Sequence, residues 1–263
     1  MDIITVGEMV IDFIPGTEEG SYIRNPGGAP ANVAIAAARN GLSAGIFCKV
    51  GDDAFGRFLI RTLEDNKVTP LSPQLCGEAV TTMAFVSLTP GGERSFTFAR
   101  KPGADMFLRV SDIQEGYLGG CKVIHGGSCS LSKGEARAAT IHALKRGHEM
   151  GKMVSFDVNY RNLMWDDDRQ AAADAVMGIL PYVDLLKISR DRHDWGAGKH
   201  RPGHEAEPGG GGGRNPGIGR GKVLFRRNLL CGKGTQGGRH CGYNGCRGCV
   251  LGRFPFQAAD KRR

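Results

Sequence analysis

The spacing of apolar and polar residues over the first 191 positions predicts short buried strands that alternate with amphipathic helices. The first strand is the apolar run 3–6, which ends at Gly7. Similar patterns predict further strands at 45–50, 123–125, 154–156 and 185–188, and helices at 30–40, 54–66, 132–150 and 169–180. Because strands that alternate with helices favour parallel βαβ units, the expected fold class is α/β, with a parallel sheet flanked by helices.

Two of these helices carry boundary signals. The alanine-rich stretch 30–40 is followed by Gly41, and glycine is typical of the position after a helix C-terminus. Ser132 and Glu135 have the spacing of a capping box, which predicts that a helix starts there and reaches about residue 150.

Two hairpin-like insertions interrupt the alternation. Residues 81–88 and 94–100 have strand character and are joined by the sequence TPGGE, whose composition is that of a turn. Residues 11–24 contain two shorter apolar runs around a polar turn. We therefore expect the insertions near 11–24 and 81–100 to form a small β-sheet lid, apart from the main α/β layer.

The composition changes abruptly near residue 191. Residues 1–191 contain 20 Lys and Arg against 23 Asp and Glu, whereas residues 192–263 contain 15 against 4. The second segment also holds 19 of the 41 glycines but only 10 Ile, Leu, Val or Phe. That apolar content is too low to compensate for the entropy of ordering a chain. We expect one domain at 1–191, and at 192–263 a Gly/Arg-rich tail that is disordered or misfolded and has no domain of its own.

The cysteines and the amino-terminal residues indicate a compartment. Widely scattered cysteines in a large domain favour reduced, buried thiols over a disulfide framework, and those of the first segment are Cys48, Cys76, Cys121 and Cys129. The first residues lack the features of a secretory peptide, and no stretch reaches membrane-spanning length. We expect a cytoplasmic protein with no membrane partner, or a plastid protein if an upstream transit peptide is missing from this sequence.

The clearest candidate for a ligand site is the stretch PGGAPANVA at 26–34, which runs directly into a helix. Glycines let the backbone approach a ligand, and the helix N-terminus offers free N–H groups. The Asn32 amide can both donate to and accept from sugar hydroxyls, and Asp12 can accept from a hydroxyl pair. On Gly27 and Gly28 alone, a turn that merely caps the helix is an equally good interpretation.

These motifs together resemble a known family. GGAPANVA followed by Gly41 and Gly51 resembles the first signature of the ribokinase-like (pfkB) carbohydrate kinases, and VGEMVIDFIP, VGDDAFG and DLLKISRD follow in the family's order. RSFTFARKPGADMFL resembles the lid of the fructokinase branch, and FDVNYRNLMW the family's D-x-N-x-R-x-x-L-W segment. The resemblance covers 1–191. It implies a ribokinase-like fold, a monosaccharide substrate, ATP and Mg²⁺ as cofactors, no nucleic-acid partner and, in many members, a homodimer formed through the lid.

The resemblance also assigns expected roles. The positions implied to contact the sugar are Asp12, Gly27, Gly28, Asn32, Phe98, Arg100 and Arg161. Lys187 and Ser189 lie on the segment that leads to the nucleotide side. In acid-sugar relatives the residue matched by Arg161 meets the substrate carboxylate. Without the resemblance, Phe98 is explained as lid packing and Arg161 as a partner of Asp157 or Asp166.

The family's catalytic segment does not follow. It is a GAGD sequence, whose glycine N–H groups bind the transferred phosphoryl group and whose Asp is the base, and no G-x-G-D occurs in these 263 residues. A shift of reading frame explains both this loss and the change of composition. With suitable wobble bases, residues 241–260 can be read as VDTTGAGDVFWGAFLFKLLT, and residues 221–238 as the paired strands that precede that signature. We therefore expect no catalytic residue in this chain.

Two other interpretations of the tail depend on composition alone. His240, Cys241, Cys246 and Cys249 have near-zinc spacing, and the basic glycine-rich stretch resembles an RNA-binding tail. The frame hypothesis explains both features as by-products. The expected function is thus an ATP-dependent kinase of a sugar hydroxyl, with fructose the leading substrate and this particular chain inactive. The alternatives are a kinase of 2-keto-3-deoxygluconate or another sugar, and a sugar-binding protein without catalysis.

Overall fold

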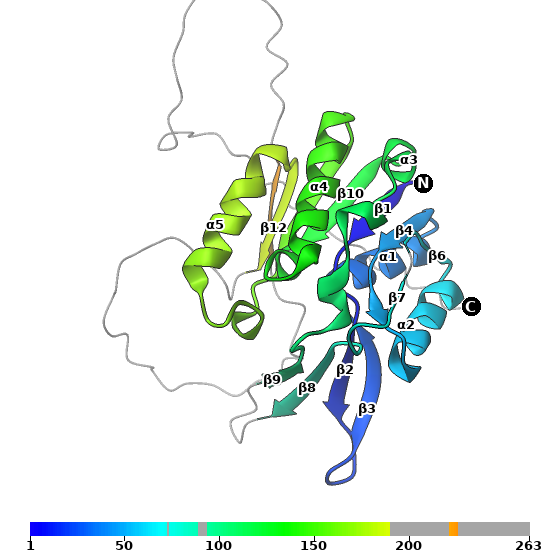
Figure 1. The fold of residues 1–263 in the computed structure, drawn as a ribbon, viewed down its shortest axis with the longest axis vertical. Coiled ribbons are helices and arrows are strands. Elements are labelled where there is room, and N and C mark those ends of the chain that lie inside the picture. Colours follow the sequence, from blue (N-terminus) through cyan, green and yellow to red (C-terminus); the bar gives the residue numbers. More distant parts are fainter. Residues whose placement is uncertain (73, 89–93, 190–220, 226–263) are drawn as a thin grey trace, which may run out of the picture. The chain divides into compact units, whose positions relative to one another are not determined.

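The structure is a computed structural model and describes residues 1–72, 74–88, 94–189 and 221–225, which belong to one compact unit, Met1–Arg227. Its main sheet has the strand order β13-β12-β11-β10-β1-β4-β6 (Figure 1). The strands are β1 (Ile3–Val6), β4 (Ala44–Phe47), β6 (Val68–Pro70), β10 (Val123–Gly127), β11 (Met153–Val158), β12 (Leu185–Ser189) and β13 (Gly221–Phe225). All neighbouring pairs among these described strands are parallel except β12 and β13, which confirms the expected α/β class.

The two insertions form a second sheet of order β3-β2-β8-β9, as predicted. Its strands are β2 (Val10–Pro15), β3 (Tyr22–Gly27), β8 (Met83–Leu88) and β9 (Arg94–Ala99). The predicted turn at 89–93 lies outside the described residues. In Figure 1 this sheet projects from one end of the main layer, the end at which the parallel strands point their carboxyl ends.

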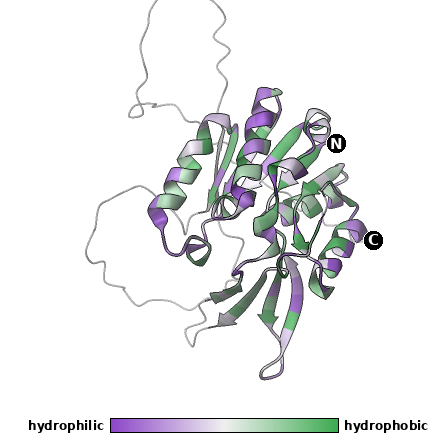
Figure 2. Ribbon diagram, in the orientation of Figure 1, coloured by the Kyte–Doolittle hydropathy of each residue, from purple (hydrophilic) through white to green (hydrophobic). Residues whose placement is uncertain are grey.

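Helices cover the main sheet on both faces. Ile46 and Phe47 are neighbours on β4 and point to opposite faces, because side chains alternate along a strand. Ile46 belongs to the apolar core beneath α1 (Ala29–Arg39) and α2 (Ala54–Asp65), and Phe47 to the core beneath α4 (Glu135–Glu149) and α5 (Arg169–Ile179). Figure 2 shows the matching pattern, with apolar central strands and polar stripes on the outer helices.

Shorter elements complete the described fold. They are the strands β5 (Val50–Gly51) and β7 (Leu75–Cys76), the helix α3 (Glu115–Gly119) and the 3₁₀ turns η1 (Ala104–Phe107), η2 (Val110–Asp112), η3 (Ser128–Leu131), η4 (Asn162–Trp165) and η5 (Leu180–Tyr182). None of the helices in the described part of the chain combines the length and apolarity needed to cross a membrane.

One sequence expectation is corrected by the structure. The capping box is wrong: α4 starts after Gly134, whose φ is 73°, and the Ser132 hydroxyl donates to the Cys129 carbonyl at 2.6 Å instead of capping α4. Of the tail, which was expected to be disordered or misfolded, the structure describes residues 221–225, which form β13 and pair along β12. The remaining tail residues, including the zinc-like cluster, lie outside the described residues.

Candidate functional site

The glycine turn joins the lid to the main layer. Gly27 ends β3, and Gly28 precedes the first residue of α1 with φ 108° and ψ 123°, a conformation that favours glycine. A Cβ at Gly27 would overlap the Asp12 carboxylate, and one at Gly28 would overlap the Glu8 carbonyl. Gly28 therefore requires glycine, because it lies against backbone and has a positive φ, whereas a side chain at Gly27 would have to displace the Asp12 carboxylate.

The lid presents Asp12 and Phe98 on one face. Asp12 on β2 stands opposite Ala84 on β8, and Ala84 stands opposite Phe98 on β9, so the three side chains form one cross-strand row. Phe98 packs against the core under α4 and α5, and its ring stacks on Phe96 with centroids 6.2 Å apart. This face of the lid is therefore turned toward the main layer.

Arg161 reaches the same face from the main layer. It follows β11 and precedes η4, and its guanidinium carbon lies 5.4 Å from the centroid of the Phe96 ring, within cation–π range. Burial raises the pKa of the half-buried Asp12 carboxyl, and the charge of Arg161 partly offsets that rise. The structure thus brings together Asp12, Gly27, Phe98 and Arg161 between the lid and the carboxyl ends of the strands, where ligands bind in open α/β sheets.

Asn32 lies in the first turn of α1 and has an exposed side chain. Its backbone N–H donates to the Gly28 carbonyl at 3.0 Å, which fixes the position of the residue relative to the glycine turn. A contact between the Asn32 amide and a sugar stays a prediction.

Arg100 is buried directly behind the lid. Its Nη2 lies 2.7 Å and its Nε 2.9 Å from Asp105 Oδ2, and its Nη1 donates to the Ser132 hydroxyl at 3.1 Å. Thr82 donates a further hydrogen bond to Asp105. The guanidinium is thus engaged within the protein, and its direct contact with a substrate also stays a prediction. Through these contacts Arg100 links the end of β9 to η1 and to the end of η3.

Glu8 was missed by the sequence reasoning. Its side chain is only 3% exposed, and burial raises the pKa of its carboxyl to about 7. One oxygen, Oε1, accepts from the backbone N–H of Ala29 at 3.3 Å, and among the described residues Oε2 has no hydrogen-bond partner. The available signal was a lone charged residue inside the otherwise apolar stretch from Val6 to Val10.

The predicted nucleotide side lies at the end of β12. Lys187 Nζ donates to Asp157 Oδ2 at 2.6 Å, across the β11–β12 pair. The lysine side chain is 53% exposed, and the aspartate side chain 10%. Ser189 is the last residue of the strand. A role for Lys187 and Ser189 toward a nucleotide stays a prediction.

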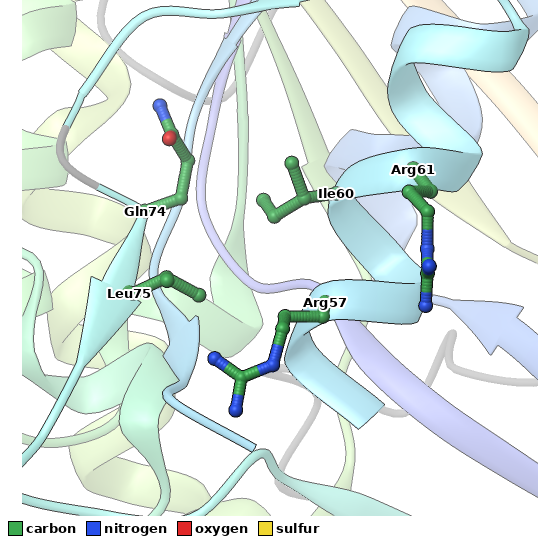
Figure 3. A pocket seen from close by; sticks show the side chains of 5 residues that line it. All are labelled: Arg57, Ile60, Arg61, Gln74 and Leu75. Carbon is green, nitrogen blue, oxygen red and sulfur yellow. The ribbon is translucent and has the colours of Figure 1, made fainter. Parts of the chain in front are cut away.

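A separate hollow of about 270 Å³ lies between α2 and β7 (Figure 3). Its lining side chains are Arg57, Ile60, Arg61, Gln74 and Leu75. It shares no lining residue with the group between the lid and the main sheet, so we do not connect it with the candidate site.

Comparison with known proteins identifies the class. The sequence matches the pfkB family carbohydrate kinases over residues 1–206, fifteen residues beyond the point at which the motifs end, and the chain belongs to this family. It is 38% identical to fructokinase-1 of rice (Oryza sativa subsp. japonica) over 193 residues, which are 71% of this chain and 59% of the relative. The chain thus spans less than two thirds of the length of that curated relative.

Solved structures agree. A fructokinase of Vibrio cholerae O395 with fructose, ADP and calcium bound matches with a TM-score of 0.65 and 37% identity, over 73% of this chain and 61% of that one. A fructokinase of Xylella fastidiosa with bound ATP matches with a TM-score of 0.63 and 28% identity, over 71% and 67% of the two chains. The particular relatives that this chain resembles are therefore fructokinases.

Proposed function

We propose that this chain is the sugar-binding part of an ATP-dependent kinase that phosphorylates a monosaccharide hydroxyl, with fructose as the preferred sugar. The observation that carries the proposal is the convergence of Asp12, the Gly27–Gly28 turn, Phe98 and Arg161 between lid and sheet. A half-buried carboxylate beside an aromatic ring and a helix N-terminus suits a polyol, which offers hydroxyl donors and an apolar face.

The described residues fit the sugar better than the phosphates. Lys187 is a half-exposed cation at the carboxyl edge of the sheet and is suited to bind a polyphosphate, but it already pairs with Asp157. In the proposed kinase, ATP supplies the phosphoryl group and Mg²⁺ neutralises the phosphates. The catalytic GAGD sequence is absent from the chain, so we propose that this polypeptide orients a sugar without transferring phosphate to it.

The electrostatics favour a neutral sugar over an acid sugar. Arg161 interacts with the charge of Asp12 and lies over the Phe96 ring, so its positive charge is partly compensated within the protein. A substrate carboxylate at Arg161 would also be repelled by the nearby negative charge of Asp12. A kinase of an acid sugar such as 2-keto-3-deoxygluconate is the second candidate, since a guanidinium can bind a carboxylate in bidentate fashion.

Calorimetric titration of the full chain with fructose and with 2-keto-3-deoxygluconate tests the proposal. Fructose should bind, and Asp12→Asn should weaken its binding about 10- to 100-fold, because a hydrogen bond to a charged group contributes about 1.5–3 kcal/mol. Asp157→Asn is the matched control and should leave fructose affinity unchanged. Tighter binding of the acid sugar than of fructose would overturn the choice of substrate, and binding of neither would refute the proposal.

A sugar-binding protein without catalysis is the alternative from another functional class. The presence of the proposed sugar-contacting residues together with the missing catalytic motif favours it for this chain. The two candidates differ in one measurement: sugar-dependent ATP turnover after the reading frame is restored supports the kinase, and its continued absence supports the binding protein.

We also propose that the lid forms a homodimer contact. The β2–β3 hairpin exposes three large apolar side chains: Ile14 is 38%, Tyr22 48% and Ile23 52% exposed. Apolar groups gathered at the tip of a hairpin are typical of a protein interface. Sedimentation of the wild type should give a dimer that Ile23→Glu converts to a monomer, whereas Met177→Glu on α5, also exposed, should remain dimeric.

The compartment is a further proposal. The cysteines Cys48, Cys76, Cys121 and Cys129 are all free and buried. Free thiols suit a reducing compartment such as the cytoplasm or a plastid stroma. Imaging of a tagged full-length gene product distinguishes the two.

A further inference from the structure

A buried charged cluster lies behind the candidate sugar site, and two of its members, Glu8 and Asp105, have no role assigned so far. It consists of Glu8, which follows β1, Arg100 at the end of β9, and Asp105 in η1, each less than 9% exposed. Glu8 and Arg100 interact electrostatically, and Arg100 and Asp105 form the ion pair described above. The cluster therefore connects the main layer, the lid and the glycine turn.

Glu8 acts directly on the start of α1. Ala29 is the first residue of that helix, and its N–H has no partner within the helix because the first four N–H groups of any α-helix lack one. The Glu8 carboxylate supplies the acceptor at 3.3 Å, and the Glu8 carbonyl lies against Gly28. A negative charge at a helix N-terminus is also stabilised by the helix dipole.

We propose that Glu8 is a positioning residue of the sugar site: its ionised carboxylate holds the Gly28–Ala29 turn and links it to the lid through Arg100. The inference rests on the proposed sugar-binding function, because the turn it positions is the one proposed to meet the sugar. Sugar binds more tightly when Glu8 is ionised, since only that form attracts Arg100 and accepts strongly from Ala29.

The pKa of the Glu8 carboxyl lies near physiological pH. Burial and, to a smaller extent, the nearby Asp105 raise the pKa of its carboxyl, whereas the backbone N–H groups of Glu8 and Ala29 and the charge of Arg100 lower it, and together they give a pKa of about 7. From η3 the remaining titratable neighbour is Cys129, a buried thiol whose own pKa is raised well above its usual value by burial. From α1 only backbone groups face the carboxyl in the described contacts. Sugar affinity should therefore rise as the pH increases through neutrality.

Two measurements on the full 263-residue chain test this inference. The first follows the ¹⁵N–¹H signal of Ala29 between pH 5.5 and 8.5, and the second measures the fructose Kd at pH 6 and pH 8. In the wild type the Ala29 signal should show an inflection near pH 7, and Kd should fall up to about tenfold, the effect of a one-unit change of pKa on binding. Glu8→Gln should abolish the inflection and give a Kd that does not change with pH.

Glu64→Gln is the matched control, because Glu64 is exposed on α2 and away from the turn, and it should behave as the wild type. A wild-type Ala29 signal without an inflection, or a Glu8→Gln chain that keeps the pH-dependent Kd, overturns the inference. If Glu8→Gln fails to fold, the titration of Ala29 in the unsubstituted chain still decides. An Ala29 inflection without fructose binding at any pH refutes the proposed function and supports only the hold of Glu8 on the helix.

Discussion

Two ion pairs at the carboxyl edge of the sheet differ in their surroundings. On the proposed sugar side, the side chains of Arg100 and Asp105 are 5% and 1% exposed, and Ser132 and Thr82 form hydrogen bonds with them. On the proposed nucleotide side, Lys187 is 53% exposed, and Asp157 is its described side-chain partner. The Arg100–Asp105 pair is buried and hydrogen-bonded to other protein groups, whereas the ammonium group of Lys187 is exposed to solvent.

This difference indicates what each region contributes. A buried ion pair stabilises only when further hydrogen bonds complete it, as they do around Arg100. In the second pair only Lys187 is exposed, and an exposed charge is held weakly by its partner, so its ammonium group can interact with a charged ligand. The residues proposed to bind the sugar are thus all described, whereas the proposed nucleotide side also requires the GAGD segment, which the frame hypothesis places in another reading frame.

The largest expected effect comes from restoring the missing part of the proposed nucleotide side. Restoring the frame after about residue 191 should return a segment close to VDTTGAGD and produce sugar-dependent ATP turnover, measured by a coupled ADP assay. Loss of a positioned base costs about 10²–10⁴-fold, and loss of preorganised donors about 10²–10³-fold. The chain as written should therefore show no measurable turnover.

The control for this experiment is the restored chain with the aspartate of GAGD changed to asparagine, which should again be inactive. Fructose phosphorylation at an ordinary enzymatic rate by the 263-residue chain, purified free of host kinases, would contradict the frame hypothesis.

The second prediction compares the two ion pairs directly. Asp105→Asn should lower the free energy of unfolding by about 3–5 kcal/mol, because it leaves the buried Arg100 charge without its partner. Asp157→Asn should lower it by about 1 kcal/mol or less, because water solvates the exposed Lys187. Urea denaturation of both variants measures the difference, and equal losses would show that burial does not distinguish the pairs.

Motifs that depend on neighbouring residues could be predicted from the sequence. The glycine turn determines where α1 starts, and the lid strands follow from their β-rich runs and turn composition. The same local reasoning failed at Ser132, because its hydroxyl donates to Cys129 and accepts from Arg100, 32 residues earlier in the chain. Spacing within one segment contains no information about such a partner.

The candidate site, too, could be predicted only where its residues lie in local sequence motifs. Asp12, Gly27 and Phe98 lie in motifs, and the structure places them together. Glu8 offered only the weak signal of one charged residue in an apolar stretch, and Asp105 offered none from spacing, because their importance comes from being buried together by folding. The burial of Arg100 likewise depends on η1 and η3, which periodicity did not predict.

The third prediction concerns His125, a buried histidine on β10. Burial lowers the pKa of His125 to about 4, its Nδ1 lies 3.0 Å from the Ser155 hydroxyl, and its Nε2 is buried without a hydrogen-bond partner among the described residues. Because the folded pKa lies below the ordinary value of 6.5, the folded state binds fewer protons between pH 6.5 and 4. This contribution to stability is full above pH 6.5 and is lost as the pH falls to about 4, a total of about 3 kcal/mol.

Urea denaturation at a series of pH values measures this effect. His125→Gln cannot titrate, so its free energy of unfolding should fall less steeply than that of the wild type between pH 6.5 and 4. His148→Gln, at an exposed position on α4, is the control and should follow the wild type. Parallel curves for wild type and His125→Gln would show that His125 is not held neutral in the folded state.

The smallest expected effect isolates the geometry of the sugar side. In Gly27→Ala the added methyl group overlaps the Asp12 carboxylate and must displace it, whereas in Gly116→Ala it meets no atom within 4 Å. Displacement should weaken, not abolish, the hydrogen bonds that Asp12 accepts from the sugar hydroxyls, so fructose affinity should fall roughly five- to tenfold. Calorimetry with both variants checks this expectation. Since neither substitution touches Lys187 or Asp157, an equal loss in both variants would mean that the close approach of Gly27 to Asp12 does not organise the site.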